Sequence, residues 1–192
     1  MTNSDQLTIG SKPAPGDLLY VQGFVNTRYV GDHSDDLATT DRAAAWFQRF
    51  GLLPPGSAIS EAERGQAVGF REGLRYLLKV NHGAPVEVDE VASLRRIIDS
   101  LPMRLSYNDD GSLELRASGE GMAGALGALQ AVVYRATSDG TWFRLKACPG
   151  QDCQWAFYDA SKNHSGVWCT MEVCGNREKV RSHRARKAHT AH

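Results

Sequence analysis

Apolar residues in the first 140 positions recur mainly at spacings of three and four, in windows too long for strands. This period is typical of amphipathic helices that bury one face. Five segments carry it, and we expect a helix in each: about residues 17–30, 42–50, 60–83, 89–101 and 122–136. The Gly31–Asp36 stretch is expected to end the first helix. The third is the best marked, because Ser60 and Glu63 form a capping-box pattern before its apolar stripe.

The period changes after Pro102. Apolar residues alternate in Met103–Tyr107 and again in Leu113–Arg116, and Asn108–Gly111 between them offers turn residues. This pattern predicts a β-hairpin, and residues 142–147 are predicted to form a further strand. The expected fold class is therefore mainly α, with a helical N-terminal domain that carries one hairpin and a small C-terminal module.

The charge distribution supports a boundary near residue 140. The chain has 192 residues, 42% of them hydrophobic, and 22 basic against 22 acidic side chains. Residues 1–140 carry a net charge of −5, whereas residues 141–192 carry +5 and contain all four cysteines. We therefore predict two domains, 1–140 and 141–192.

The sequence does not indicate a membrane protein or a secreted one. No apolar run approaches the roughly 20 residues that cross a bilayer. The first residues lack the basic and apolar regions of a secretory signal. We expect a cytoplasmic protein with reduced cysteines and no membrane partner.

The cysteines form two equally spaced pairs, C-x4-C-x15-C-x4-C, at Cys148, Cys153, Cys169 and Cys174. Two close pairs separated by a short segment are typical of zinc sites. Four thiolates complete the tetrahedron that Zn²⁺ prefers, and a site without an open position is structural. We predict one structural zinc ion per chain. The alternatives are two disulfides, which a reducing compartment disfavours, or four unrelated core cysteines.

The residues around the cysteine pairs predict the shape of the module. Gln154–Asp159 alternates in polarity, Lys162–Gly166 can turn, and Val167–Trp168 can pair back with the first segment. A helical pattern follows Cys174. The order of cysteine knuckle, hairpin and helix predicts a treble-clef-like zinc finger.

The helical segment after Asn176 is strongly basic, and Val180 is its only large apolar residue. At helical spacing its basic side chains form a ridge, which suits phosphates along a nucleic-acid groove. The predicted nucleic-acid contacts are Arg177, Lys179, Arg181, His183, Arg184, Arg186 and Lys187. The alternative is a solvated helix whose charges only keep the protein soluble.

The N-terminal domain is a poor candidate for a second nucleic-acid contact, because its net charge of −5 would repel phosphate. Asn26 and Arg28 lie at the end of the first apolar helix, where a pocket between helices could expose them to a small, anionic ligand. The domain would then sense a small-molecule effector. The alternative is that both side chains are internal struts.

No pattern in the sequence motivates an enzyme. Residues 119–124 match G-x-G-x-x-G before a predicted helix, but the strand before them is half of a hairpin, so the βαβ unit of a dinucleotide site is missing. Asp32–Asp36 could bind a divalent cation only with a further anchored ligand, and a solvated polar loop is the simpler interpretation.

The segment Trp168–Arg177 strongly resembles the CGNR zinc finger, which is named after the residue types found here at Cys174–Arg177. Its N-terminal companion, the ABATE domain, is suggested by four segments: Phe24–Thr27, Trp46, Gly51–Leu53 and Arg71–Arg75. The chain departs from the family at Asn163–Val167, where family members are usually rich in arginine. The resemblance implies a stress-induced transcription regulator of bacteria.

The resulting hypothesis is a zinc-containing, DNA-binding transcription regulator. Its basic C-terminal helix would contact the phosphate backbone, and its N-terminal domain would sense a small-molecule effector. The alternative is a zinc-braced protein-interaction adaptor that does not bind nucleic acid. The sequence leaves the oligomeric state and the choice between DNA and RNA open.

Overall fold

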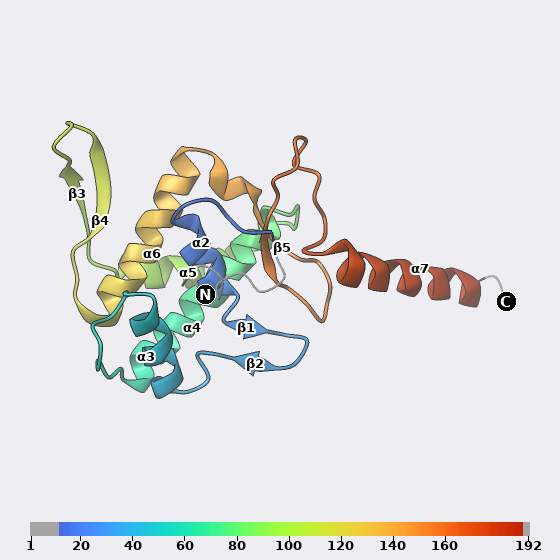
Figure 1. The fold of residues 1–192 in the computed structure, drawn as a ribbon, viewed down its shortest axis with the longest axis horizontal. Coiled ribbons are helices and arrows are strands. Elements are labelled where there is room, and N and C mark those ends of the chain that lie inside the picture. Colours follow the sequence, from blue (N-terminus) through green and yellow to red (C-terminus); the bar gives the residue numbers. More distant parts are fainter. Residues whose placement is uncertain (1–11, 190–192) are drawn as a thin grey trace.

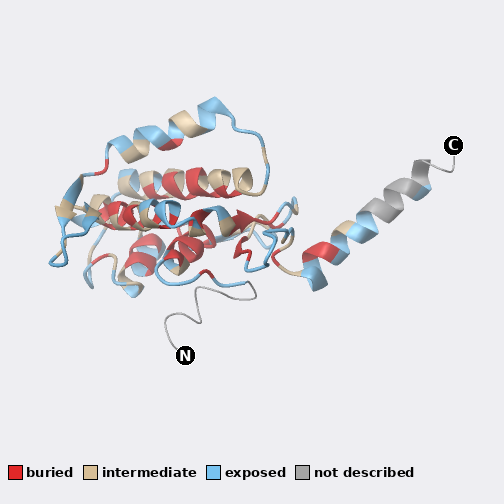
Figure 2. Cartoon of the chain, turned by 90° about the horizontal axis from the view of Figure 1, so that it is seen from above, coloured by how far each residue is buried: buried red, intermediate tan, exposed pale blue. Residues whose placement is uncertain are grey.

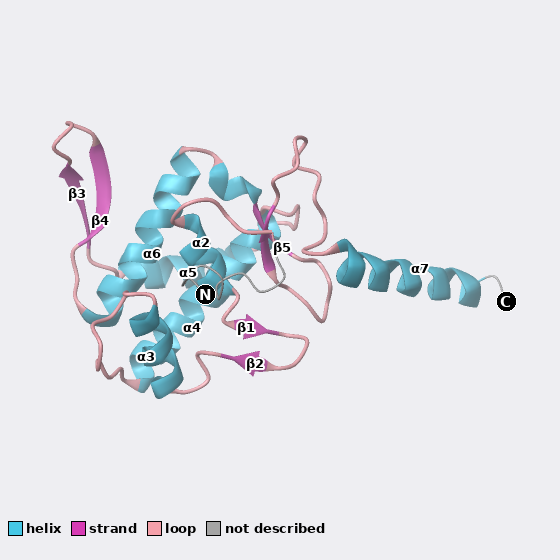
Figure 3. Cartoon of the chain, viewed as in Figure 1, coloured by secondary structure: helices cyan, strands magenta, loops and turns pink. Residues whose placement is uncertain are grey.

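The computed structural model describes residues 12–189, except for the side chains of 182–186, 188 and 189 in the last helix. The helices are α2 (Leu18–Val25), α3 (Thr40–Arg49), α4 (Glu61–Val80), α5 (Val88–Asp99), α6 (Gly121–Ser138) and α7 (Asn176–His189). The strands are β1 (Arg28–Tyr29), β2 (Ser34–Asp35), β3 (Met103–Tyr107), β4 (Leu113–Ala117), β5 (Leu145–Ala147) and β6 (Ala156–Tyr158). They pair as the antiparallel hairpins β1–β2, β3–β4 and β5–β6. The mainly helical fold class is confirmed (Figures 1 and 3).

Most helices gather in one body, from which the β3–β4 hairpin and α7 project at opposite ends (Figure 1). Helix α2 lies at the centre of this body and contacts α4, α6 and β6. Val21, Phe24 and Val25 of α2 are completely buried. The Phe24 ring packs on the rings of Trp46 and Phe47 of α3, with centroids 5.5 and 5.7 Å away. The buried residues gather in the interior of this body, and the outer faces of its helices are mostly exposed or intermediate (Figure 2).

Helix α4 begins at the predicted capping box. Ser60 Oγ accepts from the backbone N–H of Glu63 at 3.2 Å, and the Glu63 carboxylate accepts from the Ser60 N–H at 2.7 Å. These bonds satisfy two donors that the helix itself leaves open. Helix α5 packs on α4 at Gly73, where an added Cβ would lie 2.7 Å from Leu94 Cδ1. Glycine is required there because the two helices approach so closely.

The first helix is shorter than predicted. It ends at Val25, and the chain turns at Asn26 and Thr27 into the β1–β2 hairpin, which pairs Arg28 with Asp35. The N-terminal region therefore carries two hairpins, not the one expected. The physical reason is tertiary, because the side chain of Asn26 is bonded to β6 and cannot follow the helical path.

The strand predicted for residues 142–147 is also only partly right. Thr141–Arg144 forms a 3₁₀ turn, and the strand β5 covers the last three residues. Its partner is β6, so the predicted pairing of Val167–Trp168 with the 154–159 segment is wrong. Residues of β5 and β6 complete the main helical core, which favours this pairing: Leu145, Ala147, Ala156 and Tyr158.

Residues 119–124 have a packing role. Strand β4 before them pairs with β3 in an antiparallel hairpin, so it is not part of the parallel βαβ unit that a dinucleotide site needs. An added Cβ at Gly124 would lie 2.3 Å from the Gly119 carbonyl oxygen, so glycine permits the tight turn into α6. In the described part of the chain, no helix is long and apolar enough to span a membrane.

Candidate metal centre

The four cysteines lie together in one buried cluster. Their Sγ atoms all lie within 4.8 Å of one another, and the Sγ atoms of Cys153 and Cys174 each lie 3.6 Å from Cys169 Sγ. A tetrahedron with Zn–S bonds of about 2.3 Å has sulfur–sulfur edges of about 3.8 Å. The cluster therefore has the size of a tetrathiolate zinc site. A disulfide needs a separation of about 2.0 Å, and all four cysteines are free.

Two tight turns present the sulfur atoms. Cys148 follows β5 and Cys153 precedes β6, so the first pair sits in the turn of a hairpin, where the Cys153 N–H donates to the Gly150 carbonyl at 2.9 Å. Gly150 keeps this turn compact, because an added Cβ would lie 3.3 Å from Cys153 Cβ. The second pair ends in the π-helical turn Met171–Gly175, which continues directly into α7. The metal centre thus joins the β5–β6 hairpin to the basic helix.

The electrostatics of the cluster call for a cation. Hydrogen bonds from Cys153 and Cys169 lower the pKa of Cys148, which favours a thiolate there. Hydrogen bonding to Cys148, together with burial, raises the pKa of both Cys153 and Cys169. The cluster cannot hold four negative charges alone. A divalent metal ion resolves this conflict, because it favours the deprotonated form of every ligand.

Aromatic side chains enclose the cysteine cluster. Phe157 of β6 is completely buried against the cysteines, with Trp155 and Trp168 packed beside it. Tyr29 of β1 also joins this cluster and meets Trp155 edge to face, with ring centroids 5.5 Å apart. The β1–β2 hairpin of the N-terminal region is therefore part of the wall around the metal centre.

A buried ion pair shapes the loop between the two cysteine pairs. Lys146 Nζ donates to Asp159 Oδ2 at 2.7 Å and to the carbonyl of His164 at 2.7 Å, and both charged side chains are buried. Burial alone would raise the pKa of Asp159, but hydrogen bonds from Lys146, Ser161 and Gly166 outweigh it and hold that pKa well below its usual value. The 159–166 loop folds around this carboxylate and does not form the predicted hairpin.

The basic segment after Asn176 forms the helix α7, which extends away from the body of the molecule (Figure 1). Four of the predicted nucleic-acid contacts are exposed on it: Arg177, Lys179, Arg181 and Lys187. Arg181 also lies 3.6 Å from carboxylate oxygens of Asp152 and Glu178. The side chains of the other three predicted contacts lie outside the described residues: His183, Arg184 and Arg186.

The two predicted ligand contacts, Asn26 and Arg28, have different surroundings. The Asn26 amide is buried, where Nδ2 donates to the Ala156 carbonyl at 3.0 Å and Oδ1 accepts from the Ala156 N–H at 2.7 Å. Arg28 is half exposed, and its guanidinium lies 3.7 Å from the Glu72 carboxylate. Asn26 lines a cavity beside the cysteines, whereas Arg28 is not among its lining residues. Ligand binding by either side chain stays a prediction.

Comparison with known protein families adds to this geometry. The ABATE family model, described as "Putative stress-induced transcription regulator", matches residues 20–141, which is more than half of the chain. The chain belongs to the ABATE family. A second model, the CGNR zinc finger, matches residues 144–187 and includes all four cysteines. No curated protein matches the chain.

These two matches confirm the resemblance seen in the sequence. The chain carries a CGNR zinc finger, and its family is described as a "Putative stress-induced transcription regulator", not as an enzyme. The ABATE match ends at residue 141, and the zinc-finger match begins at residue 144. Whether 1–140 and 141–192 fold as separate domains stays a prediction, because β5 and β6 share the main core with the ABATE helices.

Buried Arg75 of the ABATE segment bonds it to the zinc finger, and buried Arg71 holds the neighbouring β1–β2 hairpin; no role was predicted for either from the sequence. Arg75 donates to the Val25 carbonyl at 2.6 Å and to the Gln154 carbonyl, next to Cys153, at 2.9 Å. Arg71 makes a two-pronged ion pair with Asp35 of β2, at 2.6 and 2.9 Å. Their spacing of four within a buried helix face was the available signal, since buried arginines are rare unless paired.

Proposed function

We propose that this ABATE protein is a zinc-containing, DNA-binding transcription regulator. One structural zinc ion, held by Cys148, Cys153, Cys169 and Cys174, fixes the zinc finger. Helix α7 then contacts the phosphate backbone, and the ABATE segment senses a small-molecule effector. The observation that carries the proposal is that the metal centre leads directly into an exposed basic helix.

The cluster geometry supports the zinc part of the proposal. Four sulfur ligands at tetrahedral separations leave no open position on the metal, so the ion has a structural role. When bound, it supplies folding energy by linking segments that pack little apolar surface of their own. Without it, Cys169 and Cys174 would be held against the β5–β6 hairpin by the enclosing aromatic side chains and by polar contacts such as the exposed Arg181–Asp152 pair.

The exposure of α7 supports the nucleic-acid part. Its basic residues at spacings of three and four can follow a phosphate backbone, and each phosphate neutralised releases counterions. Such contacts give affinity without sequence information. The family description as a transcription regulator makes DNA the favoured partner. The proposed contacts remain those predicted from the sequence, which run from Arg177 to Lys187.

The sensing part rests on charge and on the position of Asn26. The acidic ABATE segment is unsuited to lie along phosphate. Asn26 lines a cavity that reaches the cysteine cluster, so an effector there would contact both segments. Arg28 lies in β1 of the β1–β2 hairpin, and its guanidinium forms an ion pair with the Glu72 carboxylate.

The alternative function is a protein-interaction adaptor whose zinc finger only braces a partner surface. Binding of a fluorescent DNA duplex at low salt separates the two functions. We expect the zinc-loaded protein to bind and the R181E/R184E variant to lose binding with unchanged zinc content. The matched control is R95E/R96E, which makes the same charge change at exposed positions of α5. Absence of binding to duplex or single strands, or an equal loss in both variants, would favour the adaptor.

A further inference from the structure

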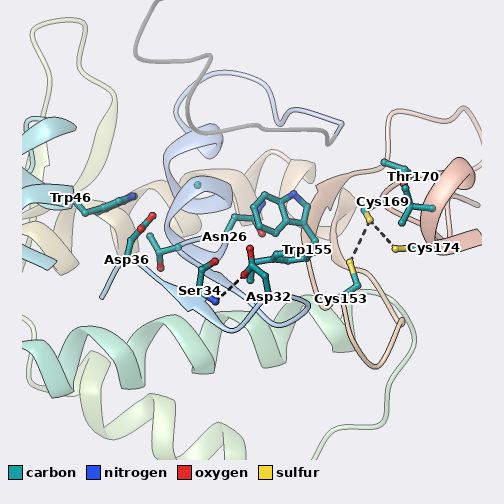
Figure 4. Close-up of a pocket in the computed structure, with 14 residues that line it drawn as sticks. Asn26, Asp32, Ser34, Asp36, Trp46, Cys153, Trp155, Cys169, Thr170 and Cys174 are labelled. Atoms are coloured by element: carbon teal, nitrogen blue, oxygen red, sulfur yellow. Dashed lines mark hydrogen bonds between the residues drawn. The ribbon is translucent and has the colours of Figure 1, made fainter. Parts of the chain in front are cut away.

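A cavity of about 550 Å³ lies between the ABATE segment and the zinc finger. Its volume is in the range of small-molecule sites, which is about 300–1,000 Å³. Figure 4 shows side chains of both segments pointing into it. The ABATE segment contributes Asn26, Tyr29, Asp32 and Trp46 to its lining, and the zinc finger contributes Cys153 and Trp155.

The floor of the cavity offers few unmet polar groups. Both the oxygen and the nitrogen of the Asn26 amide are hydrogen-bonded to the backbone of Ala156. The Thr27 hydroxyl donates to the Phe24 carbonyl at 2.8 Å and accepts from Arg71 at 3.0 Å. A ligand therefore gains little from hydrogen bonds to the floor, and its affinity must come from the aromatic walls and from charge.

The walls combine aromatic rings with negative charge. Tyr29, Trp46 and Trp155 supply the rings. Asp32 in the β1–β2 turn and Asp36 just after β2 supply the carboxylates. None of the lining residues is Lys, Arg or His. Asp36 also accepts from Arg42 at 3.0 Å, but this pair is exposed and therefore weak. A zinc ion with four thiolates would add a formal charge of −2, by the usual charges of the ion and its ligands.

We propose that this cavity binds a small organic cation, an amine or quaternary ammonium group carried on an apolar or aromatic body. A cation over a tryptophan or tyrosine ring is attracted by the ring, and nearby carboxylates strengthen that attraction. An anion would meet two carboxylates there and no lysine, arginine or histidine, so the indole N–H of Trp155 and the hydroxyl groups of the lining would be its donors. The sequence suggested an anionic ligand because of Arg28. The proposed ligand has the opposite charge, because the Arg28 guanidinium does not line the cavity.

The position of the cavity connects a bound cation to the metal centre. The β1–β2 turn already touches the first cysteine knuckle, since an added Cβ at Gly31 would lie 3.0 Å from the Asp152 carbonyl oxygen. A ligand between Asp32 and Cys153 contacts both sides of this junction. Its binding energy would fix the zinc finger, and with it the direction in which α7 projects, relative to the ABATE segment. The proposal thus rests on the sensing part of the proposed function and names its ligand class.

The first experiment compares aromatic probes of similar size and different charge on the zinc-loaded full chain. The probes are cationic 2-phenylethylammonium, neutral 3-phenylpropanol and anionic 3-phenylpropionate. Binding of each probe is measured by the quenching of tryptophan fluorescence. We expect the cation to bind at least about tenfold more tightly than the anion, which corresponds to roughly 1.4 kcal/mol. Equal binding of cation and anion, preference for the anion, or no binding of any probe at about 10 mM would overturn the proposal.

The second experiment removes the charge without removing the fold. In D32N/D36N each asparagine keeps an oxygen that can accept the existing hydrogen bonds, from the Ser34 N–H and from Arg42. We expect about tenfold weaker cation binding in this variant and unchanged binding in D89N/E90Q, the matched control on exposed positions of α5. Unchanged binding in D32N/D36N would overturn the proposal. Neither experiment contains nucleic acid, so failure here leaves the DNA-binding proposal standing, and the reverse also holds.

Discussion

Asn26 is the residue that most directly joins the ABATE helices to the zinc finger. Both ends of its buried amide pair with the backbone of Ala156, which lies three residues after Cys153. From the sequence, Asn26 could be either a ligand contact or an internal strut, because its hydrogen-bond partner is 130 positions away along the chain. The geometry shows the strut contacts.

The Asn26→Asp variant tests the energetic weight of these contacts. The carboxylate has no N–H to donate, so the Ala156 carbonyl loses one of its two donors, keeps only that of Gln22, and faces a buried charge. We expect the free energy of unfolding in urea to fall by about 2–3 kcal/mol. The same change at exposed Asn163 should cost less than about 0.5 kcal/mol. Equal effects at the two positions would contradict the strut.

The buried pair of Lys146 and Asp159 gives a second residue-scale prediction. Lys146→Met leaves a buried carboxylate without its cation, and we expect a loss of about 3 kcal/mol in unfolding free energy near neutral pH. The wild-type pKa of Asp159 is lowered, so the ionised pair contributes stability above the unfolded pKa of about 3.9 and loses it as pH falls through the folded value. The difference between variant and wild type should therefore shrink in acid. A difference that grows in acid would contradict the assignment.

At the scale of elements, long periodic segments could be predicted and short strands could not. Helices α3 to α6 and the β3–β4 hairpin lie close to their expected positions, because their patterns and caps are local. The β1 and β2 strands have two residues each, too few to show a period. The pairing of β5 with β6 depends on burial against α2 and α4, which no local pattern contains.

The packing of α4 on α5 can be tested with two glycines of the same helix. Gly73→Ala places a methyl group 2.7 Å from Leu94, and we expect a loss of about 1–3 kcal/mol. Gly65→Ala meets nothing within 4 Å, and there we expect a gain of about 0.5–1 kcal/mol from helix propensity alone. Thermal unfolding followed by circular dichroism measures both. A gain at both positions would show that the helices can separate at little cost.

At the scale of the whole molecule, the four cysteines could be predicted as a site because their spacing is itself the signal. The supports around them could not, because Tyr29, Arg75 and Asn26 come from distant parts of the chain. The sequence therefore indicated the ligands of the centre but not its attachment to the ABATE segment.

Metal removal tests that attachment. Metal analysis should find close to one zinc per chain, as four thiolate ligands require. In Cys174→Ser we expect the zinc finger to lose its structure before the ABATE helices, with a changed tryptophan spectrum and most helical signal retained. Residues of β5 and β6 belong to the same core as the ABATE helices, so their loss from that core should lower the stability of the remaining helices modestly. Full secondary structure and unchanged melting after complete chelation would contradict a structural zinc ion.

The salt dependence of duplex binding tests the central claim most directly, namely that α7 of this ABATE protein contacts phosphate. The logarithm of the binding constant should fall linearly with the logarithm of salt concentration, with a slope of about −0.9 per phosphate contact. If Arg181 and Arg184 each contact one phosphate, the slope of R181A/R184A should be less steep by about 2, with zinc content unchanged. Identical slopes for wild type and variant would show that α7 does not lie on the phosphate backbone.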